Sequence, residues 1–164
     1  MKKILPLVLI LMLALIGCNT TPTTEQYPSF NIEDITVTTD SQRVVALKKP
    51  NWSSTYHNGG MLSADGFPYQ DLTATAPNCP AINGKDFTLS AVKATFVEGK
   101  LYKITGEDLV QTASFTAPDG LYTQISDVSG EYLVCLDYLY QGKYIESLNE
   151  NERACYTYFF RLVI

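Results

Sequence analysis

The feature that most constrains the fold is the regular spacing of large apolar residues in the C-terminal third of the chain. Two long sets recur at every second position: Tyr132, Val134, Leu136, Tyr138 and Tyr140, and then Tyr156, Tyr158, Phe160, Leu162 and Ile164. Successive side chains of a β-strand point to opposite faces, so a period of two predicts strands with one aromatic face. We expect these two strands to pair antiparallel with their aromatic faces together.

Shorter strand signals cover much of the remaining chain. They are expected at 30–32, 35–37, 44–47, 87–91, 96–97, 101–104, 109–115 and 121–125, with turns at Glu98-Gly99-Lys100 and at Pro118-Asp119-Gly120. The best helical candidate, Glu146 to Arg153, is short and polar. The sequence therefore predicts an all-β chain, folded as a single antiparallel β-sandwich of about seven or eight strands.

The region from Pro50 to Pro80 carries many helix- and strand-breaking residues. We expect it to be mostly loop, with a short strand at residues 71–76. Four residues of this region are candidate partner or ligand contacts, because aromatic side chains on loops often serve in binding: Trp52, Tyr56, His57 and Tyr69. The alternative is that these aromatic side chains close the open end of the core, with His57 a solvated turn residue.

The first residues have the pattern of an export signal. Met1-Lys2-Lys3 is basic, and the apolar run from Ile4 to Ile16 is followed abruptly by polar residues. A run of about 13 residues is shorter than the roughly 20 that a membrane-spanning helix needs. Residues 1–17 are therefore interpreted as a cleaved signal peptide rather than a retained membrane helix.

Leu15-Ile16-Gly17-Cys18 resembles the lipobox of bacterial lipoproteins. The resemblance implies that Cys18 carries lipid, and that the protein is anchored to a membrane of the bacterial cell envelope. In that family Asn19 after the cysteine implies the outer membrane of a Gram-negative host. The Thr- and Pro-rich residues 19–29 form a tether that can span on the order of 35 Å, so we expect 18–29 to be anchor and tether and 30–164 the sandwich domain.

The charge of the mature chain argues against nucleic acid as a partner. Removal of the signal leaves ten basic and 17 acidic residues, a net charge of −7. The sequence has no basic patch interleaved with aromatic residues. A negative domain is also repelled by anionic lipid headgroups, so we expect it to project away from the membrane surface.

Asp127, Gly130, Tyr132 and Cys135 follow in the order seen before and within a late strand of immunoglobulin-like domains. This resemblance implies a sandwich architecture, and the spacing places Tyr132 and Cys135 on opposite strand faces. If the two long strands pair by their aromatic faces, Cys135 and Cys155 share the other face. We therefore expect a Cys135–Cys155 disulfide in the oxidising envelope, with Cys79–Cys155 as the alternative.

Motifs for catalysis and for cofactors are missing from the sequence. There is no Gly-x-Ser-x-Gly nucleophile elbow, no phosphate-binding loop, and no close pair of metal-ligating residues, so we expect no catalytic residue, metal or cofactor. The first hypothesis is a non-enzymatic protein-binding or structural module that contacts another envelope protein. The second is an envelope enzyme, or an enzyme inhibitor, that acts on glycan or peptide polymers through the 50–80 region.

Overall fold

A computed structural model describes residues 30–164 apart from 41, 58–59, 65–66, 81–86 and 127–128, so the predicted signal, Cys18 and tether lie outside it. The described residues form β1 (Thr36–Thr39), β2 (Arg43–Val45), β3 (Leu47–His57), β4 (Gly60–Ala64), η1 (Tyr69–Leu72), β5 (Asn78–Pro80), β6 (Phe87–Leu89), β7 (Thr95–Thr105), β8 (Asp108–Phe115), α2 (Gly120–Ile125), β9 (Glu131–Ile145), η2 (Glu146–Leu148) and β10 (Glu150–Val163). The predicted all-β class is confirmed, although the described strands number ten rather than seven or eight.

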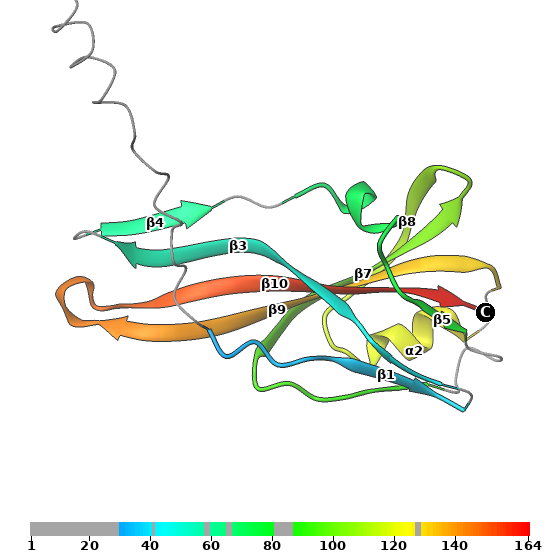
Figure 1. Ribbon diagram of the computed structural model, residues 1–164, viewed down its shortest axis with the longest axis horizontal. Helices are drawn as coiled ribbons and strands as arrows, with labels where there is room; N and C mark the ends of the chain where they lie inside the picture. Colours follow the sequence, from blue (N-terminus) through cyan, green and yellow to red (C-terminus); the bar gives the residue numbers. More distant parts are fainter. Residues whose placement is uncertain (1–29, 41, 58–59, 65–66, 81–86, 127–128) are drawn as a thin grey trace, which may run out of the picture.

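These strands form two sheets that pack on each other (Figure 1). The larger sheet has the order β4-β3-β10-β9-β7-β8, and the smaller sheet has the order β2-β1-β6. Consecutive strands form the antiparallel hairpins β3–β4, β7–β8 and β9–β10, as short connections favour. The short strand β5 pairs in parallel with the end of β10, on the side that β3 occupies further along. The predicted sandwich is confirmed.

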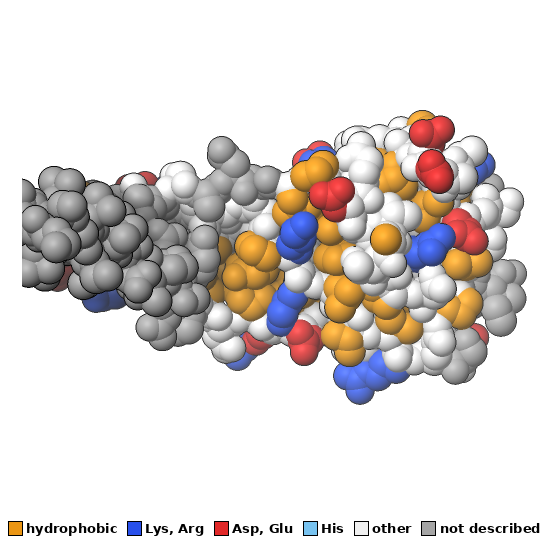
Figure 2. Space-filling model, turned by 45° about the horizontal axis from the view of Figure 1, so that its top comes forward, with side chains coloured by type: hydrophobic (Ala, Val, Ile, Leu, Met, Phe, Trp, Pro, Cys, Tyr) orange, Lys and Arg blue, Asp and Glu red, His pale blue; other side chains and the backbone are white. Residues whose placement is uncertain are grey.

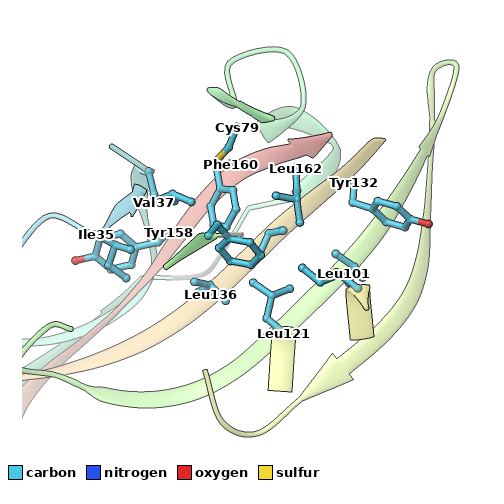
Figure 3. Close-up of a cluster of buried hydrophobic side chains, with 14 of the residues drawn as sticks. Ile35, Val37, Cys79, Leu101, Leu121, Tyr132, Leu136, Tyr158, Phe160 and Leu162 are labelled. Carbon is cyan, nitrogen blue, oxygen red and sulfur yellow. The ribbon is translucent and has the colours of Figure 1, made fainter. Parts of the chain in front are cut away.

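The main core lies between the smaller sheet and one face of the larger sheet (Figure 3). The smaller sheet and the residue before it contribute Val37 and Ile35, both fully buried. Leu121 and Ile125 of α2 pack into the same core. The larger sheet contributes the residues spaced at two in the sequence, Tyr132, Val134, Leu136, Tyr138, Tyr140, Tyr158, Phe160 and Leu162.

The two long strands pair as the sequence predicts. β9 and β10 are antiparallel, with Tyr156 opposite Tyr138 and Leu162 opposite Tyr132, so their aromatic faces coincide. The Tyr140 and Tyr158 hydroxyls are hydrogen bonded at 2.5 Å, which satisfies two polar groups inside the core. The two strands form the centre of the larger sheet.

Glu98-Gly99-Lys100 is not a turn, and this prediction is wrong. The three residues lie inside the continuous strand β7. Gly99 is needed there for close packing, because a Cβ at this position would lie 2.0 Å from the Phe115 ring of β8. The chain reverses later, between Thr105 and Asp108, where Gly106 has a φ of 63° that suits glycine.

Residues 121–125 form the helix α2, not the predicted strand. Leu121 and Ile125 are both fully buried, and a spacing of four places them on one helix face. The alternating pattern of so short a segment fits either structure, and contact with the core decides for the helix.

The 50–80 region holds more regular structure than predicted. The strand β3 runs through Pro50, which faces β10 on one side and lies beside a register shift at Cys155–Tyr156. Pro50 is tolerated because β4 pairs only with residues 53–57, so this part of β3 is an edge. Residues 71–76 form no strand, and the 3-10 helix η1 lies at 69–72 instead.

The polar segment Glu146–Arg153 is not a helix of useful length. η2 covers only Glu146–Leu148, and the chain then turns through Asn149, which has a left-handed φ of 52°. Residues from Glu150 onward belong to β10. Residues 146–149 are therefore the connection of the β9–β10 hairpin, and 150–153 are the first residues of β10.

The predicted Cys135–Cys155 disulfide is wrong, and so is the Cys79–Cys155 alternative. Cys135 lies opposite Phe159, and Cys155 lies opposite Leu139. The two cysteines share a face, but four residues separate them along the strand, about 13 Å and too far for a disulfide. Cys79 packs in the main core, on the other side of the sheet. All three are buried free thiols.

Candidate functional site

The candidate site lies on the face of the larger sheet that points away from the main core, here called the second face. Residues 67–77, here called the strap, cross part of this face and include η1. In Figure 1 the η1 coil and the helix α2 lie on opposite sides of the β9–β10 pair. The strap covers the part of the second face that holds Leu133, Cys135, Asp137 and Phe159, here called the covered half. The part that holds Trp52 and Tyr56 of β3 is exposed and is here called the open half.

A polar row crosses the second face on four neighbouring strands. The strand register places Lys49 of β3 opposite Thr157 of β10, Thr157 opposite Asp137 of β9, and Asp137 opposite Glu98 of β7. Glu98 reaches this face because a register shift leaves Val97 as an extra residue. Charged side chains inside a sheet require partners when they are buried, so their contacts define the site.

Asp137 is the centre of this row and is only 7 % exposed. The Thr157 hydroxyl donates to Asp137 Oδ1 at 2.5 Å, and the Tyr69 hydroxyl of the strap donates to Oδ2 at 3.0 Å. Both carboxylate oxygens therefore have a hydrogen-bond donor. A buried carboxylate with two such bonds is stable in the interior and fixes the groups that donate to it.

Lys100 joins the strap to the polar row from β7. Its Nζ lies 2.9 Å from Glu98 Oε2 and donates to the Tyr69 hydroxyl at 3.4 Å. It also lies 5.1 Å from the centre of the Tyr69 ring. Tyr69 therefore lies between a carboxylate and an ammonium group.

Burial and these neighbours change the acidity of the site. Burial and the Asp137 carboxylate raise the pKa of Tyr69 to about 12. Burial opposes the charge on Lys100, but its contacts with Glu98 and Tyr69 outweigh burial and leave the Lys100 pKa above its ordinary value. Burial and Asp137 also raise the pKa of Cys155 to about 12, and that of Cys135 above its usual range. At neutral pH the tyrosine and thiols are therefore protonated.

Apolar contacts hold the rest of the strap to the sheet. Leu72 and Ala76 are 1 % and 9 % exposed, and they pack on Leu133, Cys135 and Phe159. These five residues form a second, smaller core. At the start of the strap, the Lys49 ammonium group lies 4.4 Å from the centre of the Phe67 ring.

The structure brings together three of the four predicted contact residues on one face. Trp52 and Tyr56 lie two alternations apart on β3, on the open half of the second face, and each is 37 % exposed. Tyr69 lies over the covered half and binds Asp137. His57 ends β3, but its side chain lies outside the described part of the structure.

Sequence reasoning missed Asp137, Thr157 and Lys100. The signal for Asp137 was present, because it is the one charged residue between Tyr132 and Tyr140 of an otherwise apolar strand. Its partners could not be inferred, since the match of Thr157 to Asp137 depends on the hairpin register. Because both carboxylate oxygens are hydrogen bonded and little of Asp137 is exposed, the arrangement serves to fix the strap.

A second location is a wide hollow of about 660 Å³ beside the smaller sheet. It is lined by Glu33, Asp34, Thr36, Arg43, Val45, Ser90, Ala91, Val92 and Lys93. Its two carboxylates already have partners, since Asp34 lies 2.7 Å from Lys48 and Glu33 accepts from the Lys93 backbone at 2.6 Å. We regard the second face as the better candidate because its aromatic residues are both exposed and fixed by a sheet.

Within the described ranges, no group of three or more His, Cys, Asp or Glu side chains is arranged to hold a metal ion. No helix in that part of the chain is long and apolar enough to cross a membrane. Comparison with protein-family models, curated proteins and solved structures finds no match to this chain.

Proposed function

We propose that this chain is a lipid-anchored protein of the bacterial cell envelope, held at the outer membrane through Cys18. In this proposal its sandwich binds another envelope protein, without catalysis, through the open half of the second face. The observation that carries the proposal is that Trp52 and Tyr56 are exposed on one strand face beside the strap. Trp and Tyr are the residue types most often found at the energetic centre of protein interfaces.

The lipobox resemblance and the Thr- and Pro-rich segment support the anchor. The way in which the domain begins is consistent with a tether that ends at residue 29. Phe30 packs on Gly142, where a Cβ would lie 2.6 Å from the Phe30 ring. The Glu33 carbonyl accepts a hydrogen bond from Tyr158 at 2.5 Å, and the Ile32 carbonyl accepts one from Lys48 at 2.8 Å. Residues 30–33 are therefore held on the sandwich from the first residue that the structure describes.

The open half of the second face has the chemistry of an interface. Ser54 lies between Trp52 and Tyr56 on the same strand face, which places the two aromatic residues about 13 Å apart. Arg153 lies opposite Ser54 and pairs with Glu150 at 2.9 Å. In the view of Figure 2, small groups of hydrophobic side chains lie among side chains of both charges. An aromatic centre with charged neighbours favours a protein partner.

Site-specific photocrosslinking in intact cells tests the proposal. A photoreactive phenylalanine analogue at Tyr56 should give one defined adduct with a single envelope protein, and Trp52→Ala should remove that adduct. The matched control is the same analogue at Val110, which is 55 % exposed on β8 at the opposite edge of the larger sheet. Equal adducts at Tyr56 and Val110, or none at Tyr56, would contradict this binding face.

A further inference from the structure

We propose that the strap is a releasable cover, which opens about Pro77 while the rest of the sandwich stays folded and so exposes Cys135 and Phe159. The Tyr69–Asp137 hydrogen bond sets how often it opens. This inference does not depend on the lipid anchor or on the identity of a partner.

The first support is the pattern of backbone hydrogen bonds. Those described for residues 68–76 close within the strap, as in the bonds from Asp71 to Pro68, Thr73 to Gln70 and Ala76 to Leu72. The first described backbone bond from the strap to the sheet is at Pro77, whose carbonyl accepts from the Arg161 N–H at 2.8 Å. Side chains alone therefore join residues 67–76 to the second face in the described structure.

The second support is that closing the strap leaves one of its own polar atoms without a partner. Thr73 Oγ1 is buried and has no hydrogen-bond partner in the described structure. A buried hydroxyl without a partner is costly, and opening the strap would return the Thr73 hydroxyl to water. This group therefore opposes the closed form.

The third support is that only one of the two hydrogen bonds to the Asp137 carboxylate comes from the strap. Its bond from Thr157 lies within the β9–β10 pair and survives when the strap opens. Its bond from Tyr69 is the one that opening breaks, and the Lys100 bond to the Tyr69 hydroxyl breaks with it. The small second core and the Lys49–Phe67 contact also hold the strap, but they are few beside the contacts of the main core. Segments held by few contacts open locally, at a lower free energy than global unfolding.

Thiol labelling measures the opening, because Cys135 lies under the strap and Cys79 lies in the main core on the other face. The full-length protein is labelled with a maleimide under native conditions, and each cysteine is followed by peptide mass spectrometry. We expect Cys135 to react faster than Cys79. Tyr69→Phe should speed Cys135 labelling roughly ten- to hundredfold, as expected for loss of a hydrogen bond to a charged group, and leave Cys79 unchanged.

The matched control is Tyr102→Phe. The Tyr102 ring packs on the Tyr69 ring at 5.5 Å, but its hydroxyl takes no part in the Asp137 hydrogen bonds. This variant should leave the labelling rate of Cys135 within about twofold of that in the unmodified protein, because the Tyr69–Asp137 hydrogen bond stays intact. Equal acceleration by both variants, or equal rates at Cys135 and Cys79 in every protein, would overturn the proposal.

Hydrogen exchange of the unmodified protein gives a second test that needs no variant to fold. Single helical turns are unstable in water on their own, so the internal hydrogen bonds of the strap should break once it leaves the sheet. The amide protons of Asp71, Thr73 and Ala76 should therefore exchange through an opening that depends weakly on denaturant. Amide protons of β9 should exchange only through global unfolding. Exchange of the strap and of β9 with the same free energy and the same denaturant dependence would show that the strap does not open separately.

Discussion

Gly99→Ala tests the packing of β7 against the Phe115 ring of β8 most directly. The added Cβ would lie 2.0, 2.2 and 2.6 Å from three carbons of the Phe115 ring. Carbon atoms in contact prefer about 3.5–4.0 Å, so the ring must move by more than about 1 Å. It has little room, because Phe115 is 7 % exposed and stacks on Phe96 with ring centres 6.2 Å apart.

Overpacking of this kind typically costs about 1–3 kcal/mol, and we expect the upper half of that range because the obstacle is a buried ring. For a domain of this size, each kcal/mol lowers the melting temperature by about 3–5 °C. Urea unfolding followed by circular dichroism measures the change in the free energy of unfolding directly. Gly106→Ala is the control, because a Cβ added there has no atom within 4 Å and only the φ of 63° opposes the change. It should cost about 1–2 kcal/mol.

A double-mutant cycle identifies the cause. Phe115→Ala alone should cost about 3–5 kcal/mol, because it empties a buried site. Once the ring is gone, Gly99→Ala should cost almost nothing, so the two changes should deviate from additivity by more than about 1 kcal/mol. Gly106→Ala should add independently to Phe115→Ala. Additive effects of Gly99→Ala and Phe115→Ala would refute the packing argument, as would an unchanged stability of Gly99→Ala.

Three further predictions follow from the anchor and the thiols. Cys18→Ala should release the protein from the membrane fraction into the soluble fraction, and unchanged partitioning would contradict the anchor. Peptide mapping without reductant should find Cys79, Cys135 and Cys155 as free thiols, and a linked pair would contradict the β9–β10 register. Burial raises the pKa of Cys79 from 9.0 to about 11, and burial with Asp137 raises that of Cys155 to about 12. The protonated thiols therefore stabilise the fold fully below pH 9, and the free energy of unfolding in urea should fall as the pH rises from about 9 to 12; a flat profile would contradict their burial.

The class and the centre of the fold followed from the sequence alone. The spacing of two across Tyr132–Tyr140 and Tyr156–Ile164 gave both strands, their pairing and their aromatic face. A period of two is a local property, because it depends only on the geometry of one strand and on burial of one face. The shared face of Cys135 and Cys155 followed from the same parity.

The errors share a physical cause. Local rules assign Gly99 to a turn and Pro50 to a loop. In the structure both lie in strands, where Gly99 leaves room for the Phe115 ring and Pro50 lies on a strand edge. Leu121 and Ile125 fit a strand or a helix until their contact with the core is known. The local sequence shows which backbone conformations a residue can adopt. Contacts with residues far away in the chain select one of these conformations.

The candidate site divides in the same way. The sequence pointed to Trp52, Tyr56 and Tyr69 by residue type, and Asp137 was visible as a charge in an apolar strand. Only the tertiary structure decided that Tyr69 binds Asp137 while Trp52 and Tyr56 stay exposed on the same face. The alternation of side chains along a strand assigns each residue to a face of the sheet. Its partners on that face are set by the strand registers and by the path of the strap. The sequence does not give these, because they depend on contacts between segments far apart in the chain.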